Sequence, residues 1–186
     1  MLARITITGT LGLTASGCIS LAGGSGAHFP VSGPTRVASA TFAFGGWYAI
    51  RDKFVLDLQM GYELGPLGDK SNTCFMTGGR FQTPSHGWRP GYYGTLLVGF
   101  PFPNDQENWE AGPTGSAFRA GAGVAWTTFS DKKDDFGPLA YGSILLGLGY
   151  HHQEQSDIGT GDFLGVELTL VLGGNVIEAF GSDTDD

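Results

Sequence analysis

Residues 54–64, FVLDLQMGYEL, alternate strictly between an unbroken apolar set and a mixed set of side chains. Alternation with a period of two is typical of a β-strand whose two faces meet different surroundings. The apolar face consists of Phe54, Leu56, Leu58, Met60, Tyr62 and Leu64. The opposite face consists of Val55, Asp57, Gln59, Gly61 and Glu63. This segment therefore predicts a long strand with one apolar face and one mixed face.

Five further segments repeat this pattern. They are residues 36–49, 91–100, 115–128, 139–150 and 163–173. The connections are rich in turn-forming residues and comprise 65–90, 101–114, 130–138 and 153–161, together with the tight 51–53 turn. Because strands follow one another with no helical periodicity between them, they predict an all-β fold, an antiparallel up-and-down β-barrel. Residues 19–31 and 175–180 offer two more strands, which gives six clear strands and eight in total.

The composition supports a single domain and excludes a nucleic-acid partner. Glycine accounts for 32 of the 186 residues, and 41% of the chain is hydrophobic, which is ample for a packed body. The chain carries 10 basic and 18 acidic residues, a formal net charge of -8. Binding to DNA or RNA needs a clustered basic surface, which this balance does not supply. We assign residues 35–180 to the barrel domain and the acidic residues 181–186 to a solvated tail.

The N-terminus has the layout of a secretory signal, in which a basic residue and a short uncharged stretch precede small residues. Residues 15–18, ASGC, resemble the lipobox of bacterial lipoproteins, which implies that Cys18 is lipidated. We therefore assign residues 1–17 to a signal peptide and residues 18–34 to a linker or an extra strand.

Two alternatives remain for this region. Residues 4–14 also alternate and would form a strand of the mature protein if no cleavage occurs. The chain has only two cysteines, so an unmodified Cys18 is available to pair with Cys74 in an oxidising compartment.

The mixed faces decide which side of the strands meets water. Across the six clear strands they hold only four charged residues, Asp57, Glu63, Arg119 and Glu167, and are otherwise mostly small. A face exposed to water in a soluble barrel would carry many more charges. Small side chains with a few charges suit the interior of a narrow barrel, so the apolar faces should point outward into hydrocarbon. Inside, we expect Arg119 to pair with at least one of the three carboxylates, since buried unpaired charges are costly.

Over residues 36–173 the chain resembles the small outer-membrane β-barrels of Gram-negative bacteria. The resemblance implies a location in the cell outer membrane, contact with outer-membrane lipid, and a structural or surface-interaction role without catalysis or cofactor. Protein partners would then contact the loops at 65–90 and 130–138. The short 51–53 turn followed by the long 65–90 connection reverses the family's usual order, and one additional strand before Arg36 would restore it.

Two other functions are compatible with the sequence. Some outer-membrane barrels are lipid A deacylases, and His152, Ser156 and Glu154 supply the residue types for a base, a nucleophile and an acidic orienting group, with His151 and Glu167 as alternates. Their spacing differs from the His-x-Ser pattern of that family. A lipid-tethered soluble barrel that binds an apolar ligand inside is the second alternative. We expect no metal site, because the adjacent His151 and His152 face opposite sides of a strand.

Overall fold

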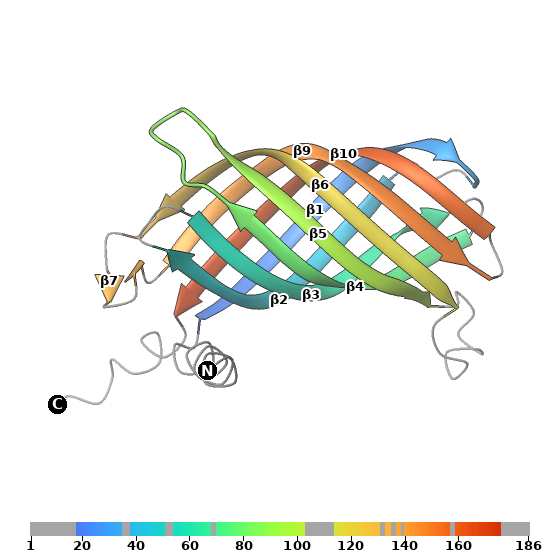
Figure 1. Ribbon diagram of the computed structural model, residues 1–186, viewed down its shortest axis with the longest axis horizontal. Coiled ribbons are helices and arrows are strands. Elements are labelled where there is room, and N and C mark those ends of the chain that lie inside the picture. Colours follow the sequence, from blue (N-terminus) through green and yellow to red (C-terminus); the bar gives the residue numbers. More distant parts are fainter. Residues whose placement is uncertain are drawn as a thin grey trace, which may run out of the picture.

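A computed structural model describes residues 18–34, 38–50, 54–67, 70–102, 114–130, 133–134, 137–138, 140–156 and 159–175. Eight strands form one closed barrel (Figure 1). They are β1 (Cys18–Ser32), β2 (Ala38–Ile50), β3 (Phe54–Leu67), β4 (Lys70–Gln82), β5 (Gly91–Phe102), β6 (Gly115–Phe129), β9 (Ala140–Gln155) and β10 (Gly159–Asn175). A small two-stranded pair, β7 (Lys133–Asp134) with β8 (Gly137–Pro138), lies in the connection between β6 and β9. In the part of the chain that is described, no helix is long and apolar enough to cross a membrane.

Each barrel strand pairs antiparallel with its neighbours in the chain, and β1 closes the barrel by pairing with β10. Because Cys18 lies opposite Asn175, β1 begins and β10 ends at the same end of the barrel, which we call the proximal end. The connections after β2, β4 and β6 also lie there, and those after β1, β3, β5 and β9 lie at the distal end. The predicted up-and-down barrel of eight strands is confirmed.

Two of the eight observed strands, β1 and β4, are additional to the six clear strands of the sequence, and only β1 lies in a segment that the sequence offered for a further strand. β1 occupies the region of residues 19–31. The eighth strand is β4, which runs through the 65–90 segment, so the prediction of a long loop there is wrong. The pattern of β4 is weak because its outward face includes Thr73, Thr77 and Gly79 rather than a run of large apolar residues. The predicted strand at 175–180, the acidic tail 181–186 and the signal peptide 1–17 fall outside the described residues, apart from Asn175.

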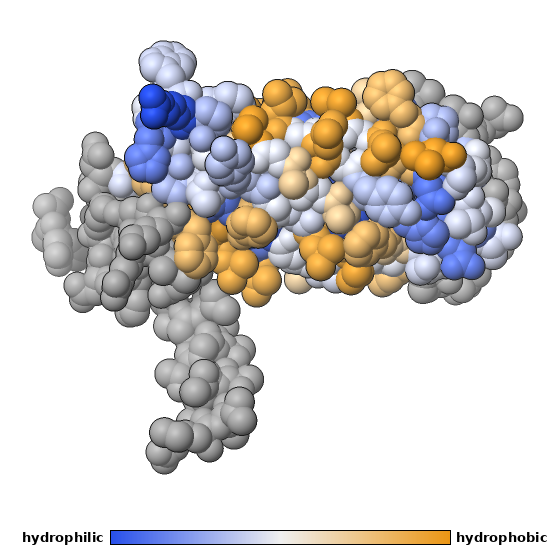
Figure 2. Space-filling model, turned by 45° about the horizontal axis from the view of Figure 1, so that its top comes forward, coloured by the Kyte–Doolittle hydropathy of each residue, from blue (hydrophilic) through white to orange (hydrophobic). Residues whose placement is uncertain are grey.

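The orientation of the side chains agrees with the prediction. Leu58 and Leu168 point outward and are 52% and 46% exposed, whereas their neighbours Asp57 and Glu167 are 1% and 3% exposed inside the barrel. Other outward side chains include Leu21, Phe42, Phe44, Met60, Leu96, Val98, Leu146, Leu148, Val166 and Leu170. On the face that Figure 2 shows, orange apolar side chains gather over the middle of the barrel, which we call the apolar band, with hydrophilic residues toward both ends.

Small residues on the inward face let the barrel stay narrow. A Cβ atom on Gly45 would lie 1.9 Å from the carbonyl oxygen of Leu58, a backbone atom that cannot move aside. On Gly149 a Cβ atom would lie 2.1 Å from Oε1 of Glu167. The glycine at 149 therefore makes the space that the Glu167 carboxylate occupies.

Candidate functional site

Arg119 of β6 lies at the centre of a cluster of charged side chains inside the barrel. Its Nη2 is 2.5 Å from Oε2 of Glu167 on β10, and its Nη1 is 3.6 Å from Oε2 of Glu63 on β3. All three side chains are buried. Arg119 thus bridges two of the three carboxylates that the sequence places inside. We call Glu63, Arg119, His151 and Glu167 the distal cluster.

His151 of β9 joins this cluster, because it lies directly opposite Arg119 in the β6–β9 register. Its Nε2 is 2.5 Å from Oε1 of Glu167, and its Nδ1 is 3.3 Å from Oε1 of Glu63. An ionised carboxylate only accepts hydrogen bonds, so both ring nitrogens donate, and the ring that fits this arrangement is the imidazolium. His28 of β1 packs edge-on against His151, with ring centroids 4.6 Å apart. With His151 charged, two cations balance two carboxylates.

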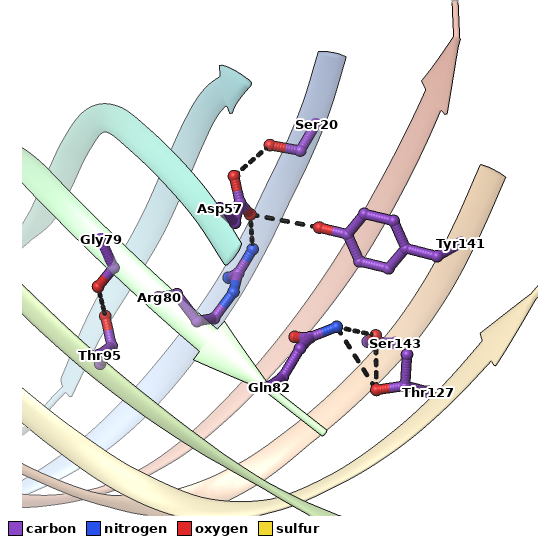
Figure 3. A network of polar contacts seen from close by, with 9 residues as sticks. All are labelled: Ser20, Asp57, Gly79, Arg80, Gln82, Thr95, Thr127, Tyr141 and Ser143. Atoms are coloured by element: carbon purple, nitrogen blue, oxygen red, sulfur yellow. Dashed lines mark hydrogen bonds and ion pairs between the residues drawn. The ribbon is translucent and has the colours of Figure 1, made fainter. Parts of the chain in front are cut away.

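Asp57 does not belong to the distal cluster. It forms a buried ion pair with Arg80 of β4, and it also accepts hydrogen bonds from Ser20 Oγ at 2.6 Å and Tyr141 Oη at 3.3 Å. Figure 3 shows these three partners converging on Asp57 from separate strands. We call Asp57, Arg80, Ser20 and Tyr141 the proximal cluster.

Polar and aromatic side chains fill the barrel beside the proximal cluster. Gln82 Nε2 donates to Ser143 Oγ at 2.6 Å, and Ser143 Oγ donates to Thr127 Oγ1 at 3.0 Å (Figure 3). The rings of Trp47 and Tyr141 meet edge to face at 4.8 Å. Side chains from β2, β4, β6 and β9 therefore pack across the interior rather than leaving a lumen.

The space between the two clusters is small. A cavity of about 40 Å³ is lined by Glu63, Arg80, Tyr93, Arg119 and Glu167 among others. Since one water needs roughly 10–15 Å³ of such space, the cavity has room for about three or four waters. The Nε atoms of both arginines are buried without an acceptor among the described residues, and such waters would supply one. The described interior is thus charged, with little free space between the two clusters, and the alternative of a barrel that binds an apolar ligand stays untested.

A third polar group lies on the outward face, at the distal ends of β9 and β10. Asp162 accepts hydrogen bonds from Ser32 Oγ at 2.5 Å, Tyr150 Oη at 2.6 Å and His152 Nδ1 at 2.9 Å. The apolar residues of β10 begin two positions later, at Leu164, so Asp162 lies beyond the apolar band. The hydrogen bond from Ser32, followed by those from Tyr150 and His152, lowers the pKa of the Asp162 carboxyl well below its usual range.

The candidate catalytic residues are not assembled around this group. His152 pairs with Asp162, Glu154 is exposed, and Ser156 lies in the turn after β9, where its amide donates to the carbonyl of Thr114 at 3.0 Å. Within the described residues no serine hydroxyl is hydrogen-bonded to His152; the one nearby, Ser32, donates to Asp162 instead.

The two cysteines lie far apart along the barrel. Cys18 is the first residue of β1 at the proximal end, whereas Cys74 lies toward the distal end of β4, where its buried thiol donates to Asn72 Oδ1 at 3.3 Å. A disulfide needs Cα atoms within about 7 Å, so the pairing of Cys18 with Cys74 is excluded. Lipidation of Cys18 stays a prediction.

Sequence reasoning missed Arg80, because this residue falls in the segment interpreted as a loop, and it assigned His151 to a strand end rather than to the interior. The available signal for Arg80 was its spacing of two residues from both Gly78 and Gln82, which places all three on one face of a strand. For the second, the signal was the even spacing of His151 from Gly149 and Gly147.

Comparisons with known proteins identify no family for the chain. No family model matches it, and no curated protein matches it. Among solved structures it is similar to the outer membrane protein OprG from Pseudomonas aeruginosa, with 13% sequence identity over 86% of this chain and 95% of that chain. The TM-score is 0.34, so the two structures superpose only loosely.

Proposed function

We propose that this protein is an integral β-barrel of the bacterial outer membrane with a structural or surface-interaction role and no catalysis. One observation carries the proposal: the outward faces of the described barrel strands are apolar or uncharged, except for Glu154 and Asp162 at the distal ends of β9 and β10. The carboxylates Asp57, Glu63 and Glu167 and the guanidinium groups of Arg80 and Arg119 are buried inside the barrel. A soluble barrel would show the reverse arrangement.

Energies and dimensions agree with a bilayer as the surrounding solvent. A Lys or Arg side chain on the lipid face at the bilayer midplane costs about 2–4 kcal/mol, and the apolar band contains none. A tilted strand crosses the hydrocarbon in about 9–11 residues. The barrel strands have between 12 residues, in β5, and 17 residues, in β10. Closed barrels with an even number of antiparallel strands are the form that bacterial outer-membrane barrels take.

The packed interior supports a structural role. The proximal and distal clusters tie β3, β4, β6, β9 and β10 together, and the cavity between them is only about 40 Å³. Contacts with partners would then involve the ends of the barrel. At the proximal end these are the 83–90 connection, which is what remains of the predicted 65–90 loop, and the 130–138 segment that contains β7 and β8.

Membrane extraction and reconstitution test the proposal. The protein should stay in the membrane pellet after a carbonate wash, and once folded in phospholipid vesicles it should migrate differently on a denaturing gel before and after boiling. The strands should resist added protease in vesicles. Release by carbonate, together with full protease sensitivity in vesicles, would show that the barrel is not integral.

A hydrolase remains the alternative, and the paired His152 and Asp162 on the outward face is the observation that favours it. Hydrolysis needs a nucleophile within hydrogen-bond reach of the histidine, and the described residues do not provide one. We therefore expect the lipid A acylation of cells to be the same with the wild-type protein and with Ser156→Ala. A loss of acyl chains that requires Ser156 would establish the hydrolase instead.

A further inference from the structure

The connection between β4 and β5, residues 83–90, is a built hairpin rather than a loose loop. At its base, Thr83 N donates to Tyr92 O at 2.8 Å, and Tyr92 N donates to Thr83 Oγ1 at 2.7 Å. Near its tip, His86 and Arg89 exchange backbone hydrogen bonds of 3.0 and 3.2 Å. Gly87 has a φ of 61°, which is the left-handed conformation that a tight hairpin turn requires.

A side contact fixes this hairpin to the barrel wall. Ser85 Oγ donates to the carbonyl of Thr127 on β6 at 2.7 Å, and Ser85 N lies 3.4 Å from the same oxygen. The direction of the hairpin is therefore set by β6 as well as by its own strands.

This fixed hairpin displays a tryptophan. Trp88 is 95% exposed, the largest exposed fraction among the described large hydrophobic side chains. Holding an indole ring in water is unfavourable, and Trp prefers sites where its ring is in apolar surroundings while its N–H stays wet. Arg89, next to it, is also exposed and supplies a cation.

The hairpin lies where the headgroups of a surrounding membrane would be. At its base, Phe81 and Tyr92 face outward, 53% and 70% exposed, at the proximal edge of the apolar band. In Figure 1 the hairpin rises beyond the outline of the barrel at one end, and Figure 2 shows hydrophilic residues projecting at the same end beside the orange band. A side chain displayed outside the barrel wall meets the lipid surface and not the water above the barrel mouth.

Distance along the chain supports the same place. Trp88 is four residues before Tyr92, about 13 Å along an extended strand. The headgroup layer is about 5–8 Å thick on each side, so this length brings the indole into that layer where the hairpin runs obliquely to the membrane normal.

We propose that this hairpin is a membrane-interface anchor: Trp88 inserts among lipid headgroups, and Arg89 binds lipid phosphate. The proposal rests on the membrane function proposed above. Indole rings are enriched at membrane–water interfaces, and the planar guanidinium matches two phosphate oxygens at once. The tight turn and the Ser85 contact present both groups without an ordering step, which lowers the entropic cost of binding.

Tryptophan fluorescence tests the anchor in the full-length protein. The protein is reconstituted in vesicles of phosphatidylethanolamine and phosphatidylglycerol, and the emission of Trp88 is obtained as the difference between the wild type and Trp88→Phe. Trp126, which lies on the outward face of β6, is followed in the same way with Trp126→Phe and reports insertion of the barrel itself.

The expected result for Trp88 is emission shifted to shorter wavelength than for indole in water, quenched by lipids brominated near the headgroup and protected from acrylamide. Emission as in water, with no quenching by brominated lipid while Trp126 is quenched, would overturn the anchor and leave the membrane function intact. If neither tryptophan is quenched, the barrel is not in the bilayer, and the anchor and the proposed function both fail.

The role of Arg89 has its own readout. Quenching of Trp88 should be stronger in vesicles that contain phosphatidylglycerol than in vesicles of phosphatidylcholine alone, and Arg89→Gln should remove this difference while leaving Trp126 unchanged. An equal response of wild type and Arg89→Gln to the anionic lipid would overturn the phosphate contact.

Discussion

Replacing Arg119 with leucine removes the cation that holds the distal cluster together. Arg119 is 7% exposed and contacts Glu167 at 2.5 Å and Glu63 at 3.6 Å. In Arg119→Leu, two buried carboxylates share one remaining cation, His151, and one negative charge is left without compensation. Breaking a buried ion pair from one side costs about 3–5 kcal/mol. At about 1.4 kcal/mol for each factor of ten, the unfolding constant should rise by roughly two to nearly four powers of ten.

Urea unfolding of the protein in phospholipid vesicles, followed by tryptophan fluorescence and by migration on unboiled gels, measures this change. Glu154→Gln, which removes an exposed charge at the end of β9, is the control and should change the free energy of unfolding by no more than about 0.5 kcal/mol. If Arg119→Leu also stays within that range, the ion pairs do not stabilise the barrel and the reasoning is refuted.

A double variant separates the loss of charge compensation from the loss of packing. Arg119→Leu combined with Glu167→Leu removes one carboxylate together with the cation, so Glu63 and His151 remain as a balanced pair. The double variant should therefore be more stable than Arg119→Leu alone. A double variant as unstable as the sum of both single changes would contradict the electrostatic explanation.

Three further perturbations test the orientation, the packing and the outward polar group. Leu168→Arg should lower the free energy of unfolding in vesicles by about 2–4 kcal/mol, while Leu168→Ala costs less; equal losses would argue against a lipid-facing position. Gly45→Ala should prevent folding, since its Cβ atom would lie 1.9 Å from a backbone carbonyl oxygen of β3. Gly23→Ala is the control and should fold normally, because the atom nearest to its Cβ would be 4.0 Å away. Heat-dependent migration on a gel distinguishes the folded from the unfolded variant. The pKa of Asp162 is lowered in the folded protein, so its contribution to stability is present above the ordinary carboxyl pKa and is lost as the pH falls below it. Ser32→Ala removes the first of its hydrogen bonds and should raise the Asp162 pKa in an NMR titration; an unchanged titration would exclude that hydrogen bond as a cause.

The orientation of the strands was predictable because it follows from local alternation. In residues 54–64 and 163–173 every second side chain is large and apolar, and the charges fall between them, so the two faces can be assigned without knowing the neighbours. The position of β4 was not predictable in the same way. Thr73, Thr77 and Gly79 replace large apolar residues on its outward face, and the alternation that remains is visible mainly from its pairing with β3.

The partners of the charged residues depend on register, which a single sequence does not reveal. Asp57 and Glu63 lie six residues apart on the same face of β3, and nothing local indicates that they belong to different clusters. The pairing of β3 with β4 places Asp57 directly opposite Arg80, and the pairing of β6 with β9 places Arg119 opposite His151. If residues 70–82 formed a loop, Arg119 would be the only basic residue on the inward faces of the six clear strands, facing three acidic residues.

With the register known, the interior charges balance. The buried charged side chains described inside the barrel are three carboxylates and three cations. The carboxylates are Asp57, Glu63 and Glu167, and the cations are Arg80, Arg119 and the imidazolium of His151. A surplus charge in a nearly full interior would be expensive, since about 40 Å³ leaves space for only a few waters to solvate it. The pairs Asp57–Arg80 and His151–Glu167 join adjacent strands, whereas Arg119 reaches across the interior from β6 to β3 and β10. A slip of one strand by one residue would move the charges of that strand onto the apolar face. The ion pairs therefore specify the register of the barrel in addition to stabilising it. A register that placed these charged side chains within the apolar band would raise the free energy of the folded barrel, because charges on the lipid face are costly.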